Sequence, residues 1–206
     1  MDAVFQILIL IMSVVIHEVS HGYAALFYGD HTAEYEGRLT LNPLKHLDPF
    51  GSVILPILLY FSSGGGFVFG WAKPVPYNPH NLRPGRWPEA FVALAGPLSN
   101  LTIALIFGLV IRFSGASAYS LNSGFYFILS LIVFINLTLA IFNLVPLPPL
   151  DGSKILFAIF PDRLYRMRGT FERYGVILTL IFIFFVWQFV APVAGMLFQV
   201  LTGVSL

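Results

Sequence analysis

Two histidines and a glutamate interrupt the apolar segment that begins the chain, in the stretch HEVSH at residues 17–21. On a helix, residues four apart project from one face, so the imidazoles of His17 and His21 can reach a single zinc ion. Glu18 lies beside them, where a carboxylate can take a proton from a metal-activated water and later deliver it to a leaving group. The spacing therefore predicts a metal centre with two histidine ligands and Glu18 as general base and acid.

The location of this motif separates two interpretations of it. In a soluble helix an HExxH pattern often arises by chance, and its histidines are then surface or hydrogen-bonded core residues. Ionisable groups inside a bilayer are costly unless they are paired or coordinated, and they usually serve a function. Because HEVSH lies within an apolar segment of membrane-spanning length, we favour the metal centre.

The chain offers few candidates for a third ligand. It contains no cysteine, so any metal must be held by histidine and carboxylate side chains. Most of the remaining carboxylates and histidines fall in loops or near the ends of apolar segments. Asp151 differs because it follows three prolines in the stretch FNLVPLPPLDG, which force the backbone out of helical geometry. We expect Asp151 to be the third metal ligand; the other role is an N-cap of the helix that follows, and the two roles could coexist.

Asn143 is a polar amide in an otherwise apolar predicted helix. It could form a hydrogen bond with a neighbouring helix. It could instead face the metal centre and bind a substrate backbone or a developing oxyanion. The residues alone leave both roles open.

The elements that must position these residues belong to a membrane protein. The 206-residue chain is 57% hydrophobic and 10% charged, and its mean hydropathy is +0.83. A net charge of +1 gives no reason to expect a nucleic-acid partner. Four segments approach the roughly 20 apolar residues that a helix needs to cross a bilayer. They cover residues 4–27, 91–111, 125–142 and 175–191.

Shorter features complete the expected fold, which is an all-α integral membrane protein in one domain over residues 1–206. Residues 50–61 are too few to cross and contain Pro56, so we expect a re-entrant or interfacial helix. Residues 67–77 show an alternating pattern and are bounded by turn residues, so they predict a short strand or β-hairpin. The tail after Pro192 either extends the last span past a proline kink or folds back along the interface.

The distribution of positive charge predicts the orientation. Ten of the eleven lysines and arginines lie between the first and second spans or between the third and fourth. Excess positive charge marks the cytoplasmic side, so we expect the N-terminus outside. At about 1.5 Å of rise per residue, His17 then lies roughly 20 Å into the bilayer, in its cytoplasmic third. The end of the third span reaches the same depth, so Asp151 can meet the HEVSH motif.

Three motifs, in this order and on separate spans, resemble the signature of the site-two protease family of intramembrane zinc metalloproteases. They are HEVSH, then AGPLSN at residues 95–100, then NLVPLPPLDG at residues 143–152. The stretches LNPLKHLDPFGS and GWAKPVPYNP are similar to the compact bacterial branch of that family, which has no PDZ or CBS domain.

Carried over to this sequence, the resemblance assigns a role to each candidate residue. Glu18 would be the catalytic base and acid, and Asn143 would orient the substrate or stabilise the tetrahedral intermediate. One Zn²⁺ per chain would be held by His17, His21 and Asp151. The AGPLSN motif would support close packing of helices through Gly96, Pro97 and Asn100.

The function implied by the resemblance is hydrolysis of peptide bonds in or near transmembrane segments of membrane protein substrates. We expect it in the bacterial cytoplasmic membrane, with the active site toward the cytoplasm. The expected partners are the lipid bilayer and a transmembrane helical substrate, and residues 67–77 could offer that substrate a strand edge. Two alternative functions are a non-catalytic zinc-binding scaffold and an ion or proton transporter. A transporter would favour inverted repeats in the sequence, and we find none. The oligomeric state has no signal in the sequence.

Overall fold

The structure, a computed structural model, describes residues 2–62, 72–115 and 124–204. Within these ranges the regular elements are all helical, as predicted. The α-helices are α1 Asp2–Phe27, α2 Thr32–Tyr35, α3 Leu55–Ser62, α4 Trp87–Phe113, α5 Gly124–Asn143, α6 Asp151–Ile159 and α7 Pro161–Thr202. Short helical turns of other types are η1 Pro43–His46, η2 Pro49–Ile54 and η3 Pro79–Asn81.

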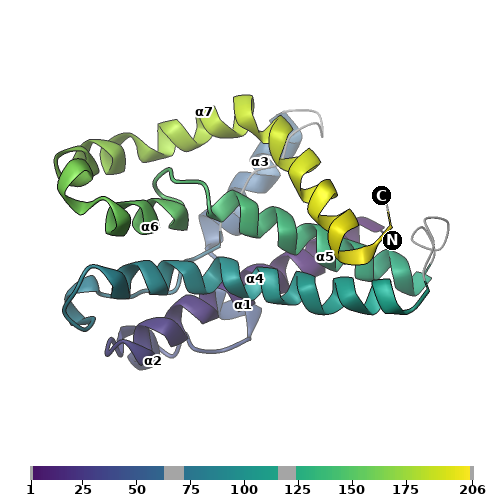
Figure 1. The fold of residues 1–206 in the computed structure, drawn as a ribbon, viewed down its shortest axis with the longest axis horizontal. Helices are drawn as coiled ribbons and strands as arrows, with labels where there is room; N and C mark the ends of the chain where they lie inside the picture. The colour runs from purple at the N-terminus through teal and green to yellow at the C-terminus, as the bar shows by residue number, and fades with distance from the viewer. Residues whose placement is uncertain (1, 63–71, 116–123, 205–206) are drawn as a thin grey trace.

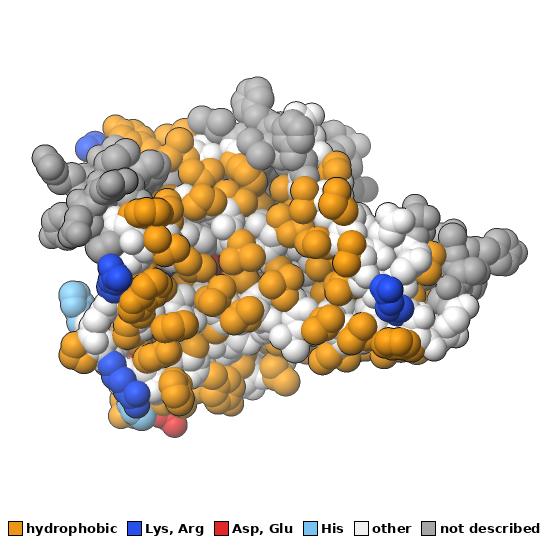
Figure 2. All heavy atoms as spheres, viewed as in Figure 1, with side chains coloured by type: hydrophobic (Ala, Val, Ile, Leu, Met, Phe, Trp, Pro, Cys, Tyr) orange, Lys and Arg blue, Asp and Glu red, His pale blue; other side chains and the backbone are white. Residues whose placement is uncertain are grey.

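Among the described residues, three helices are long and apolar enough to cross a membrane. They are α1 from Phe5 onward, α4 and α5, which confirms three of the four predicted spans. The predicted span at 175–191 lies inside α7 but is not one of the three, so its crossing stays a prediction. Figure 2 shows hydrophobic side chains across the middle of the viewed face, with lysine and arginine side chains toward its two ends.

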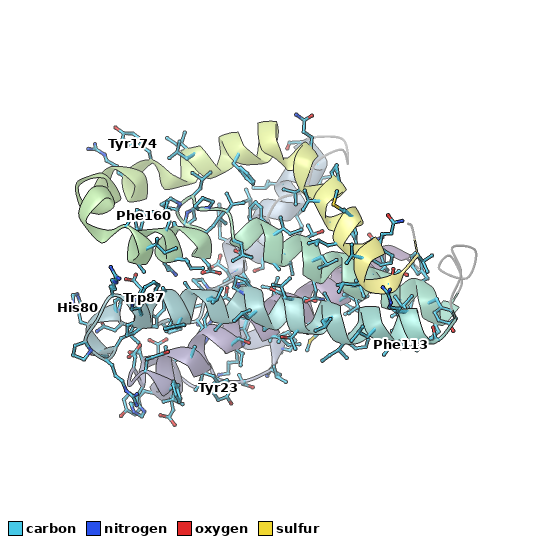
Figure 3. The ribbon with its side chains drawn as sticks, viewed as in Figure 1. Tyr23, His80, Trp87, Phe113, Phe160 and Tyr174 are labelled. Carbon is cyan, nitrogen blue, oxygen red and sulfur yellow. The ribbon has the colours of Figure 1, made fainter. Side chains whose placement is uncertain are left out.

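Helix α4 lies at the centre of the bundle and packs against α1, α5, α6 and α7 (Figure 1). Its first turn holds Pro88, whose missing N–H is not needed there, and Glu89, whose charge favours the positive end of the helix dipole. Trp87 and Phe113 lie at opposite ends of α4 (Figure 3). Helix α1 begins at the Phe113 end of the molecule and α4 ends there, so these two spans run in opposite directions.

One hydrophobic core joins α4, α5 and the C-terminal part of α7. Its buried members are Ala104, Ile111, Leu129, Val133, Leu137, Ala194 and Phe198. Helix α7 contains Pro192 and changes direction in its C-terminal part before it packs into this core (Figure 1). A proline inside a helix removes one backbone hydrogen bond and favours such a bend. The tail therefore continues the helix past Pro192, as the first of the two alternatives predicted.

Two predicted elements between α2 and α4 have different outcomes. The segment 50–61 is helical, as predicted, since η2 continues directly into α3, while its place in the bilayer stays a prediction. The predicted hairpin at 67–77 is not confirmed. Residues 72–77 form no strand with any other described segment, and residues 67–71 lie outside the described part of the chain.

The connection from α5 to α6 is compact because the chain folds back on itself at Gly152. A Cβ on Gly152 would lie only 2.5 Å from the carbonyl oxygen of Val145. The proline-rich residues after Asn143 end α5, and the close approach at Gly152 starts α6 directly beside that turn. Asp151, the first residue of α6, is thereby placed next to the spanning helices, and α6 packs on α4.

Candidate metal centre

The structure brings His17, His21 and Asp151 together as a group that could hold a metal ion. The two Nε2 atoms lie 3.0 Å apart, and Asp151 Oδ2 lies 3.2 Å from His17 Nε2 and 3.1 Å from His21 Nε2. All three residues are buried, with exposed fractions of 5% for His17, 7% for His21 and 7% for Asp151. Zinc–ligand bonds of about 2.0 to 2.1 Å in tetrahedral geometry place neighbouring ligands about 3.3 Å apart. The triangle of ligand atoms is therefore close to the size that zinc requires.

The predicted alternative role of Asp151 as a helix N-cap is wrong. The N-cap of α6 is Leu150, and Asp151 is the first residue inside the helix. The helix has no side-chain cap hydrogen bond, and the Asp151 carboxylate instead contacts the two histidines, although it is 134 residues away from His17 in the chain. Its position on α6 thus brings the carboxylate to the two histidines.

A chain of buried hydrogen bonds fixes the protonation of His17. Asn136 donates its side-chain amide to the Ile132 carbonyl at 2.8 Å, and because a carbonyl only accepts, Asn136 must present Oδ1 to Asn100. Asn100 then donates Nδ2 to that oxygen at 2.8 Å and offers its own Oδ1 to His17 Nδ1 at 2.6 Å. His17 Nδ1 therefore carries the proton, and the lone pair of Nε2 faces the site.

His21 has the same arrangement with a backbone partner. Its Nδ1 lies 2.7 Å from the carbonyl oxygen of Val92 on α4, which only accepts, so Nδ1 carries a proton and, in the neutral imidazole, Nε2 carries the lone pair. Two imidazole lone pairs and a carboxylate oxygen thus meet at 3.0 to 3.2 Å. Such atoms repel one another unless a cation lies between them. The chemistry of the three donors therefore fits a divalent metal such as zinc.

The charge of Asp151 agrees with a ligand role. Burial favours the neutral acid, whereas the charge of Lys154 favours the carboxylate. Lys154, one turn later on α6, places its ammonium 3.7 Å from Asp151 Oδ1 and over the ring of Tyr77, 5.0 Å from its centroid. Asp151 therefore presents Oδ2 to the histidines and Oδ1 to a lysine.

Gly96 on α4 forms the wall of the site that faces the two histidines. A Cβ at this position would lie 2.5 Å from His17 Nε2 and would also collide with His21 Nε2. The AGPLSN motif, which the resemblance assigned to helix packing, thus has two direct links to the metal group. Gly96 leaves the space that the imidazoles occupy, and Asn100 holds one of them in its tautomer.

Glu18 lies on α1 next to His17 but is not part of the metal-holding group. Its carboxylate Oε2 accepts a hydrogen bond of 2.8 Å from the backbone N–H of Val75. Glu18 is half-buried, so it is less enclosed than the two histidines that flank it in sequence. This arrangement suits a base that acts beside the metal without binding it.

Asn143 is the last residue of α5, and its side-chain amide donates to the Leu139 carbonyl of the same helix at 3.0 Å. That bond occupies one N–H and leaves the amide oxygen and the second N–H for other partners. Its predicted role in binding substrate or a developing oxyanion stays a prediction.

Sequence reasoning overlooked Asn136, Ser13 and the carbonyl of Val92. Asn136 and Ser13 are buried, and Asn136 Nδ2 lies 2.9 Å from Ser13 Oγ. Asn136 carries the same signal that drew attention to Asn143, an amide within an apolar helix. That signal marks a polar group in need of partners, and it does not say which partners the helix packing provides.

Comparisons with known proteins agree with this site. The sequence model of Peptidase family M50 matches residues 5–120 and 114–187. The chain is 38% identical to YwhC of Bacillus subtilis over 197 residues, which cover 93% of this chain and 82% of the relative. It is 33% identical to Rip2 of Mycolicibacterium smegmatis over 172 residues, which cover 83% of this chain and 63% of the relative. Both relatives carry a provisional zinc metalloprotease name, and no solved structure matches the chain.

Proposed function

The chain belongs to peptidase family M50, the site-two protease family that its motifs indicated, and on this premise we propose that it cleaves peptide bonds within the membrane. The substrates would be membrane proteins, cut in or near their transmembrane segments. The observation that carries the proposal is the buried meeting of two imidazole lone pairs with the Asp151 carboxylate, beside helices of membrane-spanning length. A zinc ion held by His17, His21 and Asp151 would supply the Lewis acidity that activates water for attack on a peptide bond.

Other residues would orient the metal ligands, transfer the proton and control access to the site. Asn100 and the Val92 carbonyl keep both histidines in the tautomer that offers Nε2 to the metal. Glu18, with Oε2 held by Val75, has Oε1 available to take a proton from water and to return it to the leaving amine. The helices around the site exclude lipid and limit access of water, so the substrate helix must unwind locally before its backbone can reach the metal.

The orientation completes the proposal. The excess of lysine and arginine in two of the loops supports a cytoplasmic location for the end of the bundle that holds Trp87 and His80 (Figure 3). The metal group is nearer to that end of α1 than to the N-terminus, since His17 and His21 follow most of the helix. Cleavage would therefore take place near the cytoplasmic face and release a cytoplasmic fragment.

The test is proteolysis by the purified protein in detergent, with a panel of single-span substrates and a parallel measurement of zinc content. The Glu18→Gln variant should lose cleavage by a factor of at least about 10² while it keeps its zinc, because the amide cannot take a proton. The exposed carboxylate of Glu34 on α2 provides the matched control, and Glu34→Gln should cut like the wild type.

The outcomes separate the protease from its rivals. If Glu18→Gln cuts as well as the wild type, Glu18 is not the base. If the wild type binds zinc at the three ligands but cuts none of the substrates, the non-catalytic scaffold becomes the better account. Zinc-independent ion flux in vesicles, sensitive to the same residues, would favour the transporter.

A further inference from the structure

The segment that holds Glu18 offers it a single backbone donor. Residues 74–76 read Pro-Val-Pro, and proline has no backbone N–H, so the amide of Val75 is the one donor in this tripeptide. That amide donates to Glu18 Oε2 at 2.8 Å. The two prolines also restrict the backbone on both sides of Val75. The chain therefore presents one preorganised hydrogen bond to the base.

Arg38 also holds this segment. It is 4% exposed, and its Nη2 donates to the carbonyls of Lys73 at 2.9 Å and Pro74 at 3.2 Å. The amide of Lys73 in turn donates to the carbonyl of His46 at 2.8 Å. Four backbone groups of the segment are thus hydrogen-bonded: the amide and carbonyl of Lys73, the carbonyl of Pro74 and the amide of Val75. Burying a guanidinium costs free energy, and its use on two backbone carbonyls indicates that their position matters.

The side chain of Val75 fixes the distance between the segment and α1. Val75 is 5% exposed and packs where α1 carries Gly22. A Cβ on Gly22 would lie 2.9 Å from Val75 Cγ1 and 2.5 Å from Leu39 Cδ2. The glycine therefore permits a close approach of the segment to α1, one turn beyond Glu18. This packing and the Arg38 hydrogen bonds together leave the Val75 amide little freedom.

We propose that Arg38 is a positioning residue for the catalytic base: it acts through the carbonyls of Lys73 and Pro74 to hold the Val75 amide on Glu18 Oε2. This proposal rests on the proposed protease function. The Val75 bond assigns different tasks to the two carboxylate oxygens, because Oε2 stays with the backbone and Oε1 carries the proton from water to the leaving amine. Arg38 itself contacts neither the three metal ligands nor Glu18 in the described hydrogen bonds.

The sharpest test removes only the Val75 N–H. Replacement of Val75 by its α-hydroxy acid, through suppressor tRNA, converts the amide to an ester and keeps the valine side chain. We expect kcat to fall about 10- to 100-fold with KM and zinc content unchanged, while thermal stability falls only by the loss of one hydrogen bond. Val75→Ala is the matched control, since it keeps the N–H and removes the packing. Val75→Ala should lower thermal stability, and its loss of kcat should be smaller than that of the ester variant.

Arg38 is tested with two variants and a control. Arg38→Gln should lower kcat by a similar factor, and Arg38→Lys should retain more activity because an ammonium can still donate to one of the carbonyls. Arg86, an exposed arginine whose guanidinium lies over Trp87, provides the control, and Arg86→Gln should leave kcat unchanged. Hydrogen exchange at the Val75 amide should accelerate in Arg38→Gln and not in Arg86→Gln, which tests the hydrogen bonds without reference to activity.

Each outcome bears on the proposal. Wild-type kcat in the ester variant would overturn it. Loss of zinc or of thermal stability in Arg38→Gln, together with normal turnover of the ester variant, would show that Arg38 serves only folding and would also overturn it. If the wild-type protein cuts nothing while Val75 exchange still depends on Arg38, the protease function fails and the positioning role in catalysis fails with it, although the hydrogen bonds are confirmed.

Discussion

Gly96→Ala should remove zinc from an otherwise folded protein. The added Cβ would lie 2.5 Å from His17 Nε2 and 2.6 Å from His17 Cε1, and it would also collide with His21 Nε2. Comfortable contacts of this kind lie near 3.5 Å, so a ligand atom or the helix must move by about 1 Å. Metal sites tolerate shifts in ligand distance of only about 0.2 Å.

The expected loss of zinc affinity depends on which atoms can move away from the added Cβ. Helix α4 is held between α1, α5, α6 and α7, so the imidazoles are the softer partners. Displacement of both by several tenths of an ångström should lower zinc affinity by at least about 100-fold, or about 2.8 kcal/mol. The alanine gains about 1 kcal/mol in helix propensity, which offsets part of the packing strain, so the fold should survive.

Gly108 on the same helix provides a matched control. It is also a buried helical glycine, and a Cβ there would lie 3.1 Å from Leu201 Cβ, far along α4 from the histidines. Gly108→Ala gains the same helix propensity and should keep full zinc affinity. The assay is zinc retention against a competing chelator, with thermal unfolding in parallel. Stoichiometric, wild-type zinc binding by Gly96→Ala would refute the geometry of the site as described.

Two further predictions concern buried polar groups. Asn100→Leu leaves His17 Nδ1 without its acceptor and should lower zinc affinity about 10- to 100-fold. Asn136→Leu removes the partner of Asn100, one step further from the histidine, and should lower zinc affinity less. Unchanged zinc affinity of both variants in chelator competition would contradict the tautomer argument. Asp30 is fully buried after α1, and although burial favours its neutral form, hydrogen bonds from Thr32, Asn81 and Asn78 hold its pKa below the ordinary value. A carboxylate with a lowered pKa stabilises the fold above its unfolded pKa of about 3.9, and that contribution disappears as the pH falls through the folded value. Asp30→Asn should therefore destabilise the protein at pH 7 by about 1 to 3 kcal/mol, and by progressively less as the pH falls below about 3.9, as measured by thermal or denaturant unfolding; a difference that does not depend on pH would exclude this role.

The resemblance to a known family signature predicted more of the candidate site than the predicted helices did by themselves. HEVSH places His17 and His21 on one face wherever it forms a helix, because helical geometry depends only on local backbone angles. Asp151 could be singled out because three prolines break the helix before it, and the structure brings it to the histidines. The fourth span, at 175–191, lies within the long helix α7, and its crossing stays a prediction.

Sequence by itself therefore determined the helical, membrane-spanning character of the chain, the spacing of the two histidines and the family. The tertiary structure decided which distant groups complete the site. Asn100 meets His17 across 83 residues, and Val75 meets Glu18 across 57. These contacts depend on how far each helix is rotated and how closely its neighbour approaches, which the packing of the whole bundle sets. Local periodicity identifies a buried face, but it does not identify the atom that lies opposite.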